Sequence, residues 1–204
     1  MLTLVDYGLG NIQAFANIYR RLNRPFRIAQ SPSDLAGASR LILPGVGAFD
    51  WAMDRLVASG MRESLDELVL GRQVPVLGIC VGLQMMARAS DEGVRPGLGW
   101  IPAEVKRFDA RRISEGTRLP HMGWNDVQPV GTSAIFSGIE SPRYYFLHSY
   151  YVVPDEPSIV AATTDYGGGP FASAVSVGHV AGVQFHPEKS HGWGGQLLDN
   201  FGRP

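Results

Sequence analysis

One cysteine stands in a context that suits a nucleophile. Cys80 has Gly78 and Gly82 two residues away on either side. This G-x-C-x-G pattern is the cysteine version of the nucleophile elbow, a sharp turn from a strand into a helix. Such a turn holds the side chain in strained backbone and presents it openly, and the N-terminal end of the following helix favours the thiolate. A lone cysteine is more often a small buried hydrophobe, but the flanking glycines favour the nucleophile here.

A thiol nucleophile needs a proton acceptor, and that acceptor needs a group that orients it. Among the five histidines, His186 alone follows an apolar run and precedes a carboxylate, Glu188, by two residues. Pro187 stiffens the turn, and the spacing lets Glu188 reach back to the imidazole. Taken alone, the segment fits a surface loop with an ion pair equally well. Together with the elbow, it predicts a catalytic triad of Cys80, His186 and Glu188.

The chemistry predicted for this triad is acyl transfer through a thioester, which needs hydrogen-bond donors for an oxyanion. The amide of Val81, directly after the nucleophile, is one expected donor. A glycine turn that follows the apolar run 40–43 supplies the other, from Val46 and Gly47. Without the elbow, this turn would be a simple connection between a strand and a helix. The sequence has no zinc-protease motif and no cysteine pair, so we expect no metal and no cofactor.

The elements that must position these residues show two successive sequence patterns. Up to residue 99 apolar strands alternate with helical segments, with strands expected at 2–5, 26–29, 40–43 and 74–77 and helices at 12–22 and 52–70. This alternation is typical of a parallel sheet with crossover helices, whose carboxyl edge is where ligands bind. Short runs broken by Pro, Gly and Asp then predict an antiparallel region, closed by a helix at 195–201. We expect a three-layer α/β fold, with a mostly parallel central sheet flanked by helices and an additional antiparallel region, as one domain over residues 1–204.

Composition excludes several classes of function. A chain of 204 residues with 45% apolar content can bury a full core, and a net charge of −1 gives no electrostatic reason for a nucleic-acid or membrane partner. One cysteine cannot form an intrachain disulfide, and a free thiol suits a reducing compartment. The first residues do not resemble a signal peptide, and no apolar run reaches the ~20 residues of a membrane helix. We expect a soluble cytoplasmic protein.

Six blocks, in order, resemble the class I (triad-type) glutamine amidotransferases over nearly the whole chain. They lie at 6–11, 44–49, 78–84, 120–125, 148–150 and 184–190. The blocks at 6–11, 44–49 and 120–125 closely resemble one subfamily, the glutaminase subunits of imidazole glycerol phosphate synthase. The resemblance implies that Cys80 hydrolyses glutamine to glutamate and ammonia. It also implies that the ammonia passes to a (βα)-barrel cyclase subunit, in a heterodimer that serves histidine biosynthesis.

The resemblance also carries residue roles and a regulatory expectation. It implies that the glutamine backbone is held by Gly47, Gln84, Ser149 and Tyr150, and that Asn11 and Trp124 lie near the partner face. A core position would explain Trp124 equally well. In the family the 44–47 strand is poorly arranged as an oxyanion hole until the partner acts, so activity without the partner is expected to be low.

Other functions remain open at this point. Segments 6–23 and 144–151 resemble paralogues that supply ammonia for amidation of surface-polysaccharide sugars. The triad alone also fits a stand-alone cysteine hydrolase of γ-glutamyl compounds, although the block at 120–125 and the short chain favour a docked subunit. An inactive binding partner is disfavoured by the intact triad.

Overall fold

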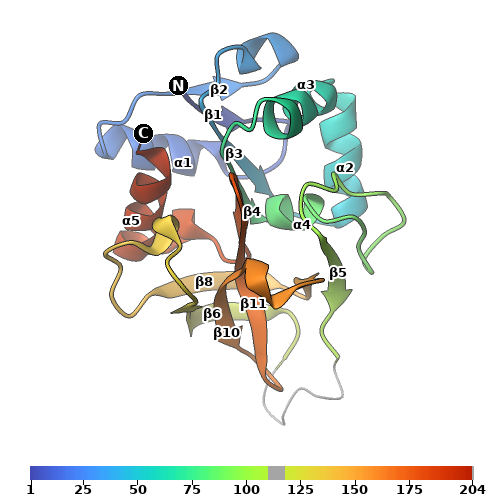
Figure 1. The fold of residues 1–204 in the computed structure, drawn as a ribbon, viewed down its shortest axis with the longest axis vertical. Coiled ribbons are helices and arrows are strands. Elements are labelled where there is room, and N and C mark those ends of the chain that lie inside the picture. Colours follow the sequence, from blue (N-terminus) through green and yellow to red (C-terminus); the bar gives the residue numbers. More distant parts are fainter. Residues whose placement is uncertain (110–117, 204) are drawn as a thin grey trace.

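The centre of the computed structural model, which describes residues 1–109 and 118–203, is an eight-stranded mixed sheet (Figure 1). The strand order is β2-β1-β3-β4-β12-β11-β10-β7. Neighbouring strands are parallel from β2 to β12 and antiparallel from β12 to β7. Two further antiparallel pairs, β5 with β9 and β6 with β8, complete the sheet structure of the described residues.

The strands have these bounds: β1 Leu2–Val5, β2 Phe26–Ala29, β3 Arg40–Gly45, β4 Val76–Cys80, β5 Ala103–Arg107, β6 His121–Asp126, β7 Gln128–Pro129, β8 Arg143–His148, β9 Tyr150–Pro154, β10 Val160–Asp165, β11 Pro170–Val177 and β12 Val180–Val183. The helices are α1 Ile12–Arg21, α2 Phe49–Ala58, α3 Arg62–Asp66, α4 Val81–Met85 and α5 His191–Gly202.

The helices cover both faces of the parallel strands. Helices α1 and α5 lie on one side and α2, α3 and α4 on the other (Figure 1). Every residue of β4 is buried, as expected for a central parallel strand with both faces covered. The predicted three-layer α/β fold is therefore confirmed. Within the described residues, the longest apolar helix is too short to cross a membrane.

Three element predictions were wrong in detail. The helix expected at 52–70 is broken after α2, because Ser59 ends it and Gly60 adopts a positive φ of 71°. The chain resumes as α3 and then widens into a π-helical turn, Glu67–Gly71. Strand β9 was not expected, and α5 begins at His191, four residues before the predicted start. Helix α5 thus extends beyond the apolar run from which it was predicted.

Close packing of α4 on β3 depends on Gly82. A Cβ at Gly82 would collide with the carbonyl oxygen of Leu43. We expect Gly82→Ala to lower the free energy of unfolding by about 1–3 kcal/mol, because backbone must move to relieve the overlap. Urea denaturation measures this, with Gly192→Ala as the control, since the space around a Cβ at Gly192 is open. Equal stability of the two variants would show that the contact is unimportant.

Candidate active site

The turn at Cys80 has the strained geometry that its flanking glycines predict. Cys80 ends β4 with φ 54° and ψ −113°, a backbone conformation that residues other than glycine rarely adopt. A Cβ at Gly78 would lie 2.8 Å from the backbone of Leu83, so glycine is required where α4 folds back on β4. The expectation of an openly presented thiol was wrong, because Cys80 is only 3% exposed.

The thiol instead faces a cavity of about 330 Å³ at the carboxyl edge of the parallel strands. This cavity brings together most of the residues expected at the site. Of the predicted residues, its lining includes Val46, Gly47, Cys80, Val81, Gln84, Ser149, Tyr150 and His186. Glu188 does not line the cavity, but it forms a hydrogen bond with His186, which does.

His186 and Glu188 form a buried pair. His186 Nδ1 lies 2.8 Å from Glu188 Oε1, and both side chains are 3% exposed. The other carboxylate oxygen, Glu188 Oε2, has no hydrogen-bond partner among the described residues. The turn that carries the pair is fixed by Ser190, whose hydroxyl donates to the His186 carbonyl oxygen (2.6 Å) and accepts from the Tyr145 amide (3.0 Å). Glu188 can therefore orient the ring and balance a positive charge on it.

The electrostatics place a proton on His186. Burial alone would lower the pKa of His186, but hydrogen bonds with Cys80 and Glu188 outweigh it and raise the pKa to about 10. An imidazolium stabilised by a sulfur on one side and a carboxylate on the other is the charge state that a thiolate nucleophile requires.

Glu92 is a cavity residue that the sequence reasoning missed. It lines the same cavity as Cys80, and its Oε2 accepts the backbone N–H of Phe49 at 2.9 Å. Burial raises the pKa of Glu92, and the Phe49 amide partly offsets this. In the sequence Glu92 is an ordinary acidic residue in a glycine loop, so no local signal points to it.

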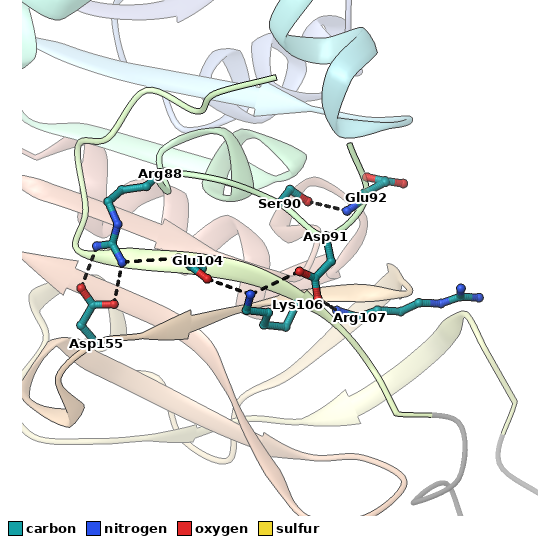
Figure 2. Close-up of polar contacts among 8 residues, drawn as sticks. All are labelled: Arg88, Ser90, Asp91, Glu92, Glu104, Lys106, Arg107 and Asp155. Atoms are coloured by element: carbon teal, nitrogen blue, oxygen red, sulfur yellow. Dashed lines mark hydrogen bonds and ion pairs between the residues drawn. The ribbon is translucent and has the colours of Figure 1, made fainter. Parts of the chain in front are cut away.

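A series of polar contacts fixes the segment that carries Glu92 (Figure 2). Arg88 pairs with Asp155 at 2.7 Å, and Lys106 joins Glu104 (2.7 Å) to Asp91 (3.2 Å). The Ser90 hydroxyl then accepts the amide of Glu92 at 3.1 Å. Each ion pair is about half-exposed, so solvent screening leaves it little effect on the stability of the fold. Their effect is to fix the position of the loop, more than to stabilise the fold.

A buried histidine pair lies beside the cavity. His148, which lines it, has Nε2 at 3.1 Å from His121 Nδ1 and Nδ1 at 2.8 Å from the Tyr150 carbonyl oxygen. His121 is stacked between Phe146 and Tyr166. Burial lowers the pKa of His148 to about 3 and that of His121 to about 4. Both rings are therefore neutral at physiological pH.

This pair predicts a loss of stability in acid. Below pH 6.5 the unfolded chain binds protons at His121 and His148 that the native chain does not. The free energy of unfolding should therefore fall as the pH drops from 6.5 towards 4, by about 1.4 kcal/mol per pH unit for each histidine. We expect His121→Gln to make this dependence shallower, as measured by urea denaturation across that range. Identical slopes for the variant and the wild type would contradict the prediction.

The two residues expected near a partner both lie at the surface. Asn11 is exposed and caps α1, accepting the Ala14 amide at 3.2 Å. Trp124 is 37% exposed and its ring is parallel to that of His191, with 5.2 Å between centroids. The core interpretation of Trp124 was therefore wrong, and the partner role stays a prediction.

Comparisons with known proteins agree with this geometry. The chain is 56% identical to the imidazole glycerol phosphate synthase subunit HisH of Bdellovibrio bacteriovorus and 44% identical to that of Leptospira interrogans, in each case over 98% of both chains. A crystal structure described as a glutamine amidotransferase has a similar fold, with a TM-score of 0.75, 20% identity and 99% coverage of both chains. The profile of the family "Glutamine amidotransferase class-I" matches residues 3–203. The resemblance noted in the sequence is confirmed, and the chain belongs to the class I glutamine amidotransferase family.

Proposed function

We propose that this chain is the glutaminase subunit of an imidazole glycerol phosphate synthase, with residues 1–204 as its single domain. It hydrolyses glutamine and delivers the ammonia to a (βα)-barrel cyclase subunit. The observation that supports this most is one cavity lined by Cys80, His186 and the predicted oxyanion donors, in a chain 56% identical to a HisH subunit. Since the nucleophile must stay reduced, we place the protein in the cytoplasm.

The proposed reaction begins with attack of the Cys80 thiolate on the side-chain carbonyl carbon of glutamine. The oxyanion that forms is stabilised by the amides of Val81 and of Val46 or Gly47, each donor being worth about 3 kcal/mol. His186 transfers its proton to the departing nitrogen, so ammonia leaves and a γ-glutamyl thioester remains on Cys80.

Hydrolysis of the thioester uses the same imidazole as a base. Once Cys80 is acylated its charge is gone, which removes the hydrogen bond that does most to keep the pKa of His186 high. The neutral ring can then take a proton from water, and the hydroxide attacks the thioester carbon. Glutamate departs, and the Cys80 thiolate and the His186 imidazolium are restored.

The cavity lining supplies partners for the charged ends of glutamine. Gly47, Gln84, Ser149 and Tyr150 hold the substrate backbone in this proposal. Glu92 Oε2 is engaged by the Phe49 amide, which leaves Oε1 for the α-ammonium group.

Glu92→Gln tests this role of the carboxylate. The side-chain carbonyl oxygen that this substitution introduces can still accept a hydrogen bond from the Phe49 amide, so the loop should stay in place. Because a charged hydrogen bond is lost, we expect KM for glutamine to rise about 10-fold with little change in kcat. Steady-state kinetics of glutamate release measures both constants. An unchanged KM would remove Glu92 from the substrate site.

The proposed function is tested by measuring glutamate release with and without the cyclase subunit of the same organism and its phosphorylated ligand. We expect weak turnover alone and a large rise with the loaded partner. Fast hydrolysis of γ-glutamyl peptides without any partner would favour the stand-alone hydrolase. If glutamate release rose only with a sugar-amidating partner, the protein would instead be assigned to polysaccharide synthesis, because the ammonia would then have a different acceptor.

A further inference from the structure

A buried side-chain amide that the proposed mechanism does not use points at the nucleophile. Gln184 lies between β12 and the triad histidine, is fully buried, and has Nε2 at 3.8 Å from Cys80 Sγ. Sulfur accepts hydrogen bonds at longer distances than oxygen, so this contact concerns the orientation and charge of the thiol. Whether the contact donates to the sulfur depends on which end of the Gln184 amide faces it.

The Tyr150 carbonyl oxygen determines the orientation of the Gln84 side-chain amide, which in turn contacts Gln184. A carbonyl can only accept, so both of its neighbours must donate: Gln84 Nε2 at 3.0 Å and His148 Nδ1 at 2.8 Å. The amide of Gln84 is therefore oriented with its nitrogen towards Tyr150. The side chain of Gln84 is 2% exposed, so water has little access with which to compensate a reversed orientation.

The orientation of Gln84 settles that of Gln184. Gln84 Nε2 also lies 3.1 Å from Gln184 Oε1, and two amide nitrogens cannot bond each other in this way. Gln184 must therefore turn its oxygen to Gln84 and its NH₂ group to Cys80. Reversing it would put two NH₂ groups face to face and an oxygen lone pair against the sulfur, and the buried Gln184 has no solvent contact that could compensate.

From this geometry we infer that Gln184 is a positioning residue for the nucleophile. Its N–H, directed through Gln84 by the Tyr150 carbonyl, holds Cys80 Sγ in place and favours the thiolate over the thiol. A hydrogen bond to an ionised sulfur is stronger than one to a neutral sulfur, so the contact selectively stabilises the charged form of Cys80. The inference rests on the proposed function, in which Cys80 is the nucleophile.

The test is the rate at which Cys80 in the full chain is alkylated by iodoacetamide as a function of pH. Gln184→Met removes the donor while keeping a side chain of similar length. We expect the pH at which alkylation reaches half of its maximal rate to be about one unit higher in this variant than in the wild type, because the donor that favours the ionised sulfur is lost. Glutamine turnover should fall through kcat, with KM for glutamine nearly unchanged.

Thr164→Val is the matched control. It removes another buried hydrogen bond, from Thr164 Oγ1 to Ser173 Oγ at 2.9 Å, and neither residue lines the cavity. If the two variants shift the alkylation profile equally, or Gln184→Met leaves it where the wild type has it, the inference is wrong. Alkylation needs no glutamine hydrolysis, so a failure of the proposed function would appear separately, as an absence of turnover in the wild type.

Discussion

Replacement of Glu188 by glutamine is expected to lower kcat for glutamine hydrolysis by roughly 10³–10⁴-fold. Glu188 Oε1 accepts from His186 Nδ1 at 2.8 Å in a site where both side chains are 3% exposed. An amide at this position can turn its NH₂ group to the ring and stabilise the wrong tautomer. It also removes the negative charge that helps to keep a proton on His186.

The measurement is kcat in the presence of the cyclase subunit, with Glu104→Gln as the control. Glu104 belongs to the exposed ion-pair series with Arg88 and Lys106, so its neutralisation should leave kcat nearly unchanged. KM for glutamine should change little for Glu188→Gln, because this carboxylate contacts His186 and is not placed against the substrate. A Glu188→Gln enzyme that retains kcat within a few-fold would exclude the triad as drawn.

Removal of the sulfur should have an even larger effect. We expect Cys80→Ala to reduce glutamine hydrolysis by roughly 10⁴-fold or more, with or without the partner, because no other group at the turn can form the thioester. The same change should lower the pKa of His186 from about 10, since the hydrogen bond with Cys80 is lost. NMR titration of the His186 ring follows this shift independently of activity.

Cys80→Gly separates chemistry from folding. Glycine adopts a φ of 54° without strain, so this variant should be at least as stable as the wild type. It should nevertheless be as inactive as Cys80→Ala. Appreciable turnover by either variant would show that hydrolysis does not proceed through Cys80.

The parts of the site that are predictable from sequence are those encoded within a few residues. The elbow is one such part, since Gly78 is required by the close approach of the Leu83 backbone, only five residues further along the chain. The alternation of strands and helices likewise predicts the parallel half of the sheet. These features depend on local geometry, so the spacing of residues in the sequence predicts them.

The features that sequence did not reveal depend on pairing across long distances. His121 and His148 meet because β6 pairs with β8 in one register, and a shift of one residue would separate them. Glu92 reaches the cavity through contacts with Phe49 and with an ion-pair series that ends at Asp155. The depth of Cys80 was also misjudged, because the walls that cover it come from distant segments.

The central claim is that Cys80 is the nucleophile that attacks glutamine. The most direct test is to treat the chain with acivicin, an electrophilic glutamine analogue, in the presence of the cyclase subunit and to locate the adduct by peptide mass spectrometry. We predict one adduct, on Cys80, formed more slowly when excess glutamine is present. An adduct on any other residue, or labelling of Cys80 that glutamine does not slow, would contradict the claim.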